Sequence, residues 1–401
     1  GGNALAAVGS CVALVGIFVN LIVGLSVGPN AALASLIGQK KRDKIPEMLH
    51  TILAFGVLLG VGLMVLGLLL ARVILEVSGT PESVMGEALV YIRIYLLSIP
   101  FMSVYNFGAA ILRSYGDTRR PMYYLIVSGT VNVILNLVFV IGFGMGVSGV
   151  AIATWISNII STIMVLYHLA KRQDEFHLDR KQLKINKKAL KKVLQIGIPA
   201  GIQGAIFSIS NVFIQSGINS FGEDAIAGSS LALNFEYFTY DIANAFAQAA
   251  VTFTSQNYGA GKYKRMDRVL ADCMILSVGV ALVLGCAAYF FGPQILQIYT
   301  DNSQVIGSGM EILSITTIPY FLCGIMDLIP GALRGVGCSA APMILSVIGT
   351  VGTRIVWIYL LFPYHRSLFF LFISYPGSWL FTILMQVVCF YYVRKKTIKV
   401  L

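Results

Sequence analysis

Two carboxylates, Glu236 and Asp241, stand in a stretch that is otherwise apolar enough to lie within a lipid bilayer. A charged side chain near the centre of a membrane helix costs at least ~2.5–3.5 kcal/mol, so it usually faces a cavity on an ion or substrate path. We expect both acids to bind a cation or a proton; the alternative is that they form structural ion pairs. Asp241 also belongs to a row of polar side chains spaced three or four residues apart, which is one face of an α-helix. The members of this row are Asn234, Tyr237, Asp241, Asn244, Gln248, Thr252 and Ser255.

A third acid and further polar residues extend this set. Asp327 has apolar neighbours in the sequence, which favours a carboxylate facing a cavity, and the alternative is an ion pair with Arg354 of the next helix. Arg354 stands alone in an apolar run, where neutralising an acid is its expected role. Asn132 and Asn136 share a helix face, and they either line a cavity or form interhelical hydrogen bonds. The remaining residues expected to line a substrate cavity are Asn211, Gln215, Asn234, Tyr237, Asn244 and Gln248.

The composition indicates an all-α, polytopic membrane protein. Hydrophobic residues make up 57% of the chain and charged residues 12%, and the mean hydropathy is +0.80. Because the basic residues cluster between apolar runs, the net charge of +11 reports membrane topology and does not predict a nucleic-acid partner. The six cysteines form no CxxC pair, and no catalytic triad, metal motif or phosphate loop is recognisable, so we expect neither an enzyme nor a metal site.

Eleven hydrophobic spans can be drawn, and the basic residues assign their orientation. All but four of the 29 lysines and arginines fall in every second loop or in the C-terminal tail, which places the C-terminus in the cytoplasm and Gly1 outside. The expected spans are 4–27, 46–71, 85–112, 120–142, 148–170, 194–218, 225–256, 269–291, 305–333, 341–362 and 368–393.

The chain also contains an internal repeat. An offset of 221 residues carries Leu112-Arg113 to Leu333-Arg334 and Pro121-Met122 to Pro342-Met343. We therefore expect two parallel-repeat helical lobes with a site between them. The expected domains are an N-lobe of five transmembrane helices (1–170), a cytoplasmic linker (171–192) and a C-lobe of six (193–401). The first helix of the N-lobe would precede Gly1, so the parent protein should hold 6+6 helices and this chain 5+6.

Several motifs resemble the multidrug and toxic compound extrusion (MATE) family of exporters, and the likeness covers essentially the whole chain. The resemblance implies two six-helix lobes and export of organic cations driven by Na⁺ or H⁺. The family often has an Asp ten residues before Leu-Arg-Gly; here Cys323 holds that place and Asp327 follows one turn later. The family also often has an Asp on its first helix, which this chain does not contain. The motifs begin at Asn3 (Asn-Ala-Leu-Ala-Ala-Val-Gly), Leu112 (Leu-Arg-Ser-Tyr-Gly-Asp-Thr-Arg-Arg-Pro), Gly146 (Gly-Val-Ser-Gly-Val-Ala-Ile-Ala-Thr), Ser255 (Ser-Gln-Asn-Tyr-Gly-Ala-Gly-Lys) and Leu333 (Leu-Arg-Gly-Val-Gly).

These observations favour a secondary active exporter in a prokaryotic plasma membrane. We expect Asp241, Glu236 and Asp327 to bind Na⁺ or H⁺, with no other cofactor, and the protein to act as a monomer on a small-molecule substrate. The offset matches Asp241 with Asn20 and Asp327 with Asn106, so ion binding is expected in the C-lobe. One alternative is a flippase for a lipid-linked saccharide, which would favour a cationic cavity. Another is a passive channel or sensor, which needs no acid whose protonation changes.

Overall fold

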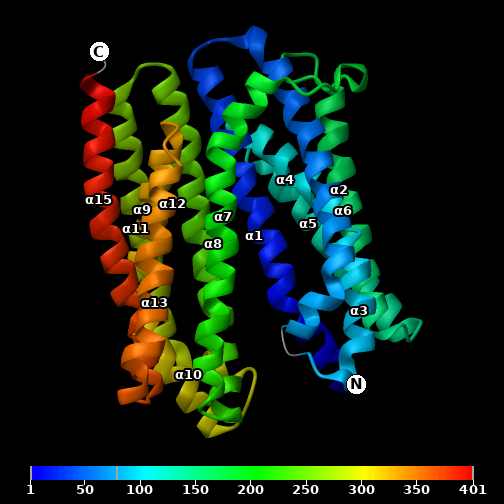
Figure 1. Cartoon of the computed structure of the whole chain (residues 1–401), viewed down its shortest axis with the longest axis vertical. Coiled ribbons are helices and arrows are strands. Elements are labelled where there is room, and N and C mark those ends of the chain that lie inside the picture. The colour runs from blue at the N-terminus through cyan, green and yellow to red at the C-terminus, as the bar shows by residue number, and fades with distance from the viewer. Residues whose placement is uncertain (1, 78–79, 400–401) are drawn as a thin grey trace. The chain divides into compact units, whose positions relative to one another are not determined.

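The computed structural model (Figure 1) describes residues 2–77 and 80–399, and every regular element within them is a helix. This confirms the all-α prediction. Short π-helical turns interrupt two regions, at Leu137–Gly142 after α5 and at Val347–Gly352 and Trp357–Leu361 around α13. The α-helices are α1 (Gly2–Gly38), α2 (Ile45–Val77), α3 (Glu82–Leu96), α4 (Ile99–Ser114), α5 (Arg119–Asn136), α6 (Gly146–Lys171), α7 (Lys187–Asn219), α8 (Glu223–Gly259), α9 (Tyr263–Gln297), α10 (Ser303–Thr316), α11 (Tyr320–Gly335), α12 (Ala340–Ser346), α13 (Thr353–Val356), α14 (Leu368–Phe372) and α15 (Ser374–Lys399).

Eight of the described helices are long and apolar enough to cross a membrane, or up to ten if each bent pair counts as one span. The bent pairs are α3 with α4, at 41°, and α10 with α11, at 49°. Each of the eleven expected spans coincides with one of these or with α8. Helix α8 has 37 residues and is long enough to cross a membrane, but it is less apolar than the other spans. Its row of polar side chains lowers its hydropathy.

The helix boundaries repeat with the offset found in the sequence. Adding 221 to the first residues of α3, α4 and α5 gives the first residues of α10, α11 and α12. Each copy thus has a short helix, a bend, a second short helix and a π-helical interruption in the next span. Proline helps to place both bends, since Pro100 lies in the first turn of α4 and Pro319 directly precedes α11.

The chain divides into two compact units, Gly1–Ala205 (unit 1) and Ile206–Leu401 (unit 2). The boundary lies inside α7, whereas we expected it in the linker 171–192. Glycine explains why the first half of α7 belongs to unit 1. A Cβ atom on Gly197 would lie 2.7 Å from the carbonyl oxygen of Leu25, and one on Gly24 would lie 2.5 Å from that of Ala200, so α1 and α7 approach backbone to backbone.

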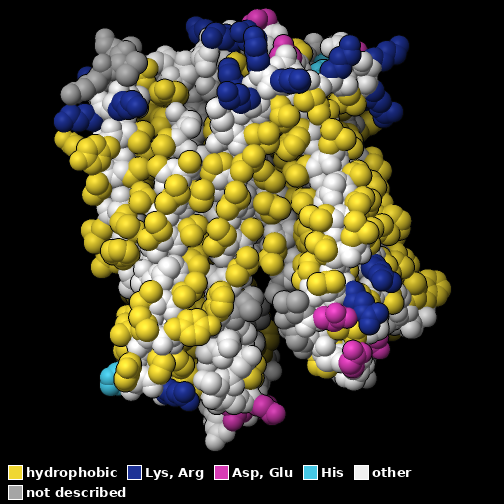
Figure 2. All heavy atoms as spheres, in the orientation of Figure 1, with side chains coloured by type: hydrophobic (Ala, Val, Ile, Leu, Met, Phe, Trp, Pro, Cys, Tyr) yellow, Lys and Arg dark blue, Asp and Glu magenta, His cyan; other side chains and the backbone are white. Residues whose placement is uncertain are grey.

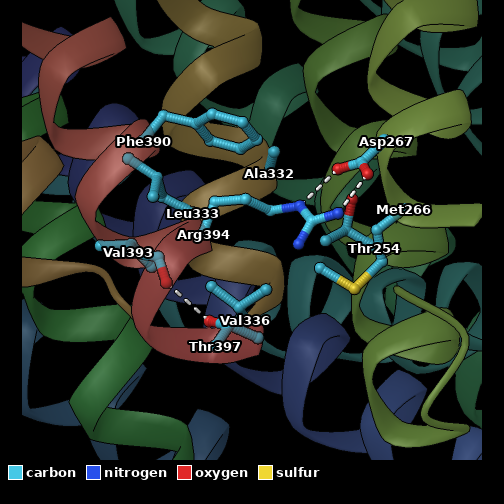
Figure 3. A pocket seen from close by; sticks show the side chains of 10 residues that line it. All are labelled: Thr254, Met266, Asp267, Ala332, Leu333, Val336, Phe390, Val393, Arg394 and Thr397. Carbon is cyan, nitrogen blue, oxygen red and sulfur yellow. Dashed lines mark hydrogen bonds and ion pairs between the residues drawn. The ribbon is translucent and has the colours of Figure 1, made fainter. Parts of the chain in front are cut away.

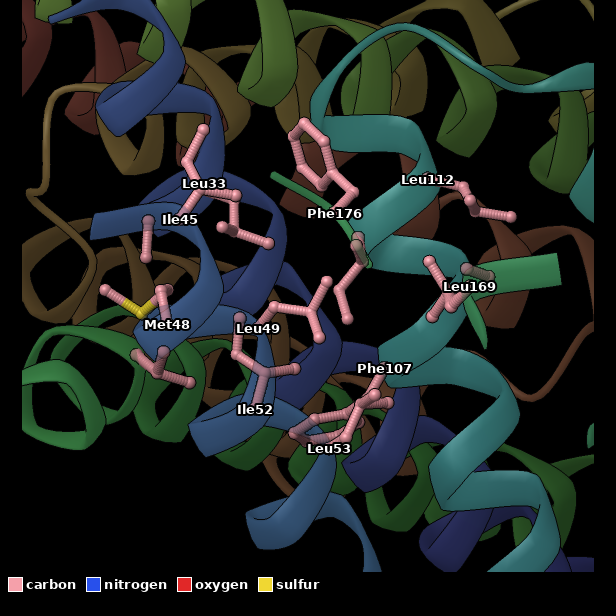
Figure 4. Close-up of a cluster of buried hydrophobic side chains, with 14 of the residues drawn as sticks. Leu33, Ile45, Met48, Leu49, Ile52, Leu53, Phe107, Leu112, Leu169 and Phe176 are labelled. Atoms are coloured by element: carbon pink, nitrogen blue, oxygen red, sulfur yellow. The ribbon is translucent and has the colours of Figure 1, made fainter. Parts of the chain in front are cut away.

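Each unit has its own apolar core. In unit 1, α1, α2, α4 and α6 contribute residues such as Leu33, Leu49 and Phe107, which Figure 4 shows pointing toward one another. In unit 2, residues from α8, α10, α11 and α15 form a second core that includes Tyr320, Tyr375 and Trp379. Figure 2 shows hydrophobic side chains covering the middle of the helices in each unit, with lysines and arginines gathered near their ends. This is the surface of a protein that lies in a bilayer.

Residues 172–186, which we call the strap, pack against the end of unit 1. Phe176 and Leu178 are buried in the unit 1 core. The guanidinium of Arg172 lies over the rings of Tyr115 and Phe176 and donates to the Asp174 carboxylate. This hydrogen bond, together with the one from the Phe176 amide, lowers the pKa of Asp174 below its ordinary value. The strap is therefore an ordered segment with its own packing.

Backbone hydrogen bonds fasten the second half of the strap to α2. The Asp179 amide donates to Nε2 of His50 at 3.0 Å, and the Asn186 amide donates to Oγ1 of Thr51 at 3.1 Å. Thr51 in turn donates to the carbonyl of Lys184 at 3.3 Å. Since His50 and Thr51 are buried, these bonds satisfy polar groups that would otherwise be costly to bury.

Candidate functional site

Glu236 lies in the interior of unit 2. It is on the packed side of α8 and is only 4% exposed. The Thr316 hydroxyl donates to Oε1 of Glu236 at 2.6 Å and also lies 3.0 Å from the carbonyl of Ile312, so one proton serves two acceptors. Thr316 is the last residue of α10, directly before the 49° bend. The carboxylate of Glu236 is thus anchored where the α10–α11 pair changes direction.

Arg354 on α13 is a second buried charged residue of unit 2, and within the described residues it forms no ion pair with Glu236. Its side chain is 6% exposed, and its guanidinium carbon sits 3.9 Å from the centroid of the Tyr375 ring. Its Nε donates to the Ser378 hydroxyl at 3.3 Å. We call Glu236, Thr316, Arg354, Tyr375 and Ser378 the Glu236 cluster. The expectation that Arg354 neutralises an acid stays a prediction, since no ion pair of Arg354 occurs among the described residues.

Asp327 has different neighbours from those expected. It is partly exposed on α11, and the charged group that acts on it is Arg334, about two turns further along the same helix. Tyr240 of α8 also interacts with it electrostatically. Among the described residues no ion pair joins Asp327 to Arg354, so that alternative is wrong for this conformation. The physical reason is that Arg354 is held over Tyr375 and bonded to Ser378.

The polar row on α8 passes from an open to a packed environment. Asn234, Tyr237 and Asp241 are exposed, Asn244 and Gln248 are partly buried, and Thr252 and Ser255 are buried. In the described part of the chain no hydrogen bond or ion pair engages the Asp241 carboxylate. Of the three predicted acids, Asp241 is therefore the most accessible to a ligand.

Two further predicted residues lie on the second half of α7, which belongs to unit 2. Asn211 is exposed, and Gln215 donates to Oδ1 of Asn219 at 3.0 Å. Both side chains remain accessible for substrate contacts, and among the described residues neither forms a hydrogen bond with the Glu236 cluster. Their assignment to a cavity stays a prediction.

In unit 1, Asn132 forms the interhelical hydrogen bond that we gave as its alternative role, whereas Asn136 bonds within its own helix. Asn132 donates to Oγ1 of Thr154 at 3.4 Å, which links α5 to α6, and Asn136 donates to Oδ1 of Asn132 at 3.0 Å. The offset of 221 matches Thr154 with Tyr375 and Val133 with Arg354. The place that holds a cation in unit 2 is thus neutral in unit 1.

Sequence reasoning missed Thr316, Tyr375 and Ser378. A hydroxyl directly before a proline-associated bend was the available signal for Thr316. For Tyr375 and Ser378 the sequence carried a weaker signal, since they lie one turn apart on a helix that has to cover Arg354. No cluster of three or more His, Cys, Asp or Glu that could hold a metal occurs within residues 2–77 and 80–399.

A small pocket lies elsewhere in unit 2, near the end of α15. Thr254, Met266, Leu333 and Arg394 are among its lining residues, and Figure 3 shows Arg394 reaching the Asp267 carboxylate. The predicted acids and cavity residues do not line it. Arg394 makes a forked pair with Asp267, which contrasts with the stacked arrangement of Arg354.

Comparisons with known proteins agree on one family. The MatE family model matches residues 1–138 and 199–360. The chain is 29% identical over 404 residues to the probable multidrug resistance protein YoeA of Bacillus subtilis, covering 99% of this chain and 87% of the relative. It is 24% identical over 323 residues to the multidrug export protein MepA of Staphylococcus aureus, covering 80% of this chain and 71% of that protein.

A solved structure extends this agreement to the fold. An outward-facing multidrug resistance MATE family transporter of the MOP superfamily superposes with a TM-score of 0.90 at 21% identity, covering 100% of this chain and 89% of that one. Because the family model matches well over half of the chain, the resemblance seen in the sequence is confirmed. The chain belongs to the MATE family of multi-pass membrane transporters for multidrug efflux, which are not enzymes.

Proposed function

We propose that this protein is a secondary active antiporter that exports organic, often cationic, drugs or toxic compounds in exchange for Na⁺ or H⁺. The observation that carries the proposal is the placement of three acids within helices of unit 2, namely Glu236 and Asp241 on α8 and Asp327 on α11. Asp241 is exposed, and Asp327 is partly exposed. In unit 1 the matching positions are Asn20 and Asn106, which cannot ionise.

The names of the relatives support the substrate class. They are multidrug resistance and multidrug export proteins of bacteria. The polar row of α8 would supply hydrogen bonds to a bound drug, and its exposed Tyr237 would supply an aromatic face. We place the protein in a prokaryotic plasma membrane, as its bacterial relatives suggest, and as a monomer. The basic residues in alternate loops favour a cytoplasmic C-terminus.

The test is transport by full-length protein in proteoliposomes, with Na⁺ and pH gradients imposed separately. Asp241→Asn and Asp327→Asn keep the side-chain shape but cannot ionise, and each should abolish gradient-driven efflux without changing the amount of folded protein. Asp224→Asn is the matched control, since Asp224 lies in the first turn of the same helix. Efflux at the wild-type rate by both Asp241→Asn and Asp327→Asn would refute the assignment. Substrate flux that ignores both gradients would indicate a channel.

A further inference from the structure

A cavity lies at the end of unit 1, where the strap packs against the helices. Its volume of about 570 Å³ is within the usual range of ligand pockets. Lys40, Arg42, Tyr115, Glu175 and Phe176 are among its lining residues, and we call it the strap pocket. The acids and polar residues assigned to transport do not line it. The strap pocket is therefore a candidate site of its own.

The repeat places a pocket at the matching position of unit 2. The offset of 221 residues matches Ile45 and Tyr115, which line the strap pocket, with Met266 and Val336. Met266 and Val336 line the small pocket near the end of α15 (Figure 3). The volume of that pocket is about 10 Å³, which is the space of a single water molecule. The same place in the repeat is thus open in unit 1 and closed in unit 2.

An ion pair accounts for the closure in unit 2. Arg394 and Asp267 both line the small pocket, and Nε of Arg394 donates to Oδ1 of Asp267 at 2.7 Å. The matching residues of unit 1 are Gln173 and Pro46, which cannot form an ion pair with each other. Unit 1 therefore cannot fill this space in the same way, and the strap pocket keeps its volume.

Lys40 lines the strap pocket at a conformational cost. Its φ is 58°, and it is the one non-glycine residue with positive φ in the described chain. The matching residue of unit 2 is Gly261, with φ 68°, and glycine adopts this conformation without the clash that a Cβ atom causes. A strained residue that persists where glycine would fit indicates that its side chain has a role.

The charged groups of the strap pocket satisfy one another poorly. Nε of Arg42 lies 3.6 Å from Oε1 of Glu175, which is longer than the ~2.7–2.9 Å of a charge-assisted hydrogen bond. Among the described residues no hydrogen bond engages the side chains of Lys40, Arg42 or Glu175. The Arg42 side chain is 79% exposed and that of Glu175 is 27% exposed. Two cations and one acid are thus available to a ligand.

These charges fit a zwitterionic ligand better than an anion. A phosphate could accept from Lys40 and Arg42 while a primary ammonium on the same ligand donates to Glu175. An anion without an ammonium would separate Arg42 from Glu175 and leave that carboxylate unpaired beside a negative charge. A quaternary ammonium has no N–H to donate. The best complement is therefore a phosphate joined to a primary ammonium.

The bilayer is a source of such a group within reach of the strap pocket. Residues 7–38 and 42–76 are candidate membrane spans, so Lys40 lies between the ends of two of them and Arg42 begins the second. Ile37 and Ile45, one from each span, add apolar lining. Basic pockets at the ends of membrane helices are typical sites for lipid headgroups.

We propose that the strap pocket binds the headgroup of a phospholipid that carries a phosphate and a primary ammonium, as phosphatidylethanolamine does. Lys40 and Arg42 hold the phosphate, and Glu175 holds the ammonium. The bound headgroup joins the end of α1 to the strap. This site lies in unit 1 and does not depend on the proposed antiport.

The experiment is native mass spectrometry of the full-length protein in detergent. Three lipids with identical acyl chains are added in turn: phosphatidylethanolamine, phosphatidylcholine and phosphatidylglycerol. The wild type should bind one phosphatidylethanolamine about tenfold more tightly than phosphatidylcholine, as expected for one charge-assisted hydrogen bond. Equal binding of the three lipids would overturn the proposal. Soluble O-phosphoethanolamine that bound as tightly as the lipid would overturn the assignment to a lipid.

Two variants separate recognition from a structural role. Glu175→Gln should abolish the preference for phosphatidylethanolamine over phosphatidylcholine, because the ammonium loses its partner. Lys40→Gly should weaken phosphatidylethanolamine binding by about tenfold. Its melting temperature without lipid should not fall, because glycine suits the positive φ.

Lys264→Gln is the matched control, since Lys264 is an exposed lysine at the start of α9 in unit 2. It should bind all three lipids as the wild type does. A preference that survives in Glu175→Gln would overturn the proposal. So would a Lys40→Gly protein that melts at a lower temperature and still binds phosphatidylethanolamine as tightly as the wild type.

Discussion

Replacing Phe176 with alanine should release the strap from unit 1. Phe176 is 4% exposed, and its ring centroid lies 4.6 Å from that of Tyr115. Removing a buried phenylalanine side chain costs about 3–5 kcal/mol, and an aromatic pair adds about 0.5–1.5 kcal/mol to the burial of area. The same truncation removes one of the two rings beneath Arg172, whose guanidinium lies 5.3 Å from the Phe176 ring.

The lost stabilising free energy should make local opening of the strap easier and leave the rest of the protein folded. A loss of 3 kcal/mol corresponds to an opening constant that rises by roughly a hundredfold, at about 1.4 kcal/mol for each factor of ten. Hydrogen exchange on the full-length protein measures this opening. The amides of Leu178, Asp179 and Asn186 are good reporters, because each donates to a partner outside the strap. Their exchange should accelerate by about that factor.

Leu183→Ala is the matched control, since Leu183 lies in the same segment but is 42% exposed. Its effect on exchange should be close to zero. If Phe176→Ala leaves the three amides as protected as in the wild type, the strap is not held by this packing. Equal acceleration in unit 2 would instead mean that the whole protein has been destabilised.

Two further outcomes follow from contacts in unit 1. The pKa of Asp174 is lowered by its hydrogen bond to Arg172, so its contribution to strap stability should be complete above the ordinary aspartate value of ~3.9 and lost as the pH falls through the lower folded value. Exchange at the strap amides should show this acid step, and Asp174→Asn should remove it. Gly197→Ala would place a Cβ 2.7 Å from the Leu25 carbonyl and should cost about 1–3 kcal/mol by overpacking. A thermal melt checks this against Gly279→Ala, whose new Cβ meets nothing within 4 Å; similar losses in both variants would contradict it.

Much of the fold could be predicted from the sequence, because strong physical constraints produce the apolar runs and the repeated motifs. A bilayer requires spans of a minimum length with internally satisfied backbone groups, so hydropathy alone delimits most helices. The 221-residue offset also carried real structural information, since it matches the starts of α4 and α11 at Ile99 and Tyr320. Hydropathy does not report contacts between helix backbones, so it could not show that the two compact units divide inside α7. The close packing of Gly197 on α1 attaches the first half of α7 to unit 1.

The candidate site was predicted only in part, for a different reason. An acid within an apolar run is visible in the sequence, and so Glu236, Asp241 and Asp327 were identified. Which cation faces which acid depends on helix rotation and on π-helical turns such as Val347–Gly352, which ends two residues before Arg354. Such a turn changes the direction of the side chains that follow it. Spacing in the sequence therefore could not decide whether Arg354 faces Asp327 or Glu236.

The two copies of the repeat share a similar arrangement of helices, but only the copy in unit 2 carries charged residues at the matched positions compared below. In each copy a residue at the same position of the repeat contacts the neighbouring helix. In unit 1 this residue is Thr154, which joins α6 to α5, and in unit 2 it is Tyr375, which joins α15 to α13. In unit 1 the partner is the neutral Asn132, and the link is an ordinary hydrogen bond between helices. In unit 2 it is the cationic Arg354, whose guanidinium lies over the Tyr375 ring, and the same unit also buries the acid Glu236. A buried acid and a buried base can each respond to a change in nearby charge, whereas two neutral hydrogen-bonding side chains cannot. Of the two matched places, the one that carries buried charge is in unit 2, and the difference arises from substitutions at matching positions of the repeat such as Val133 and Arg354.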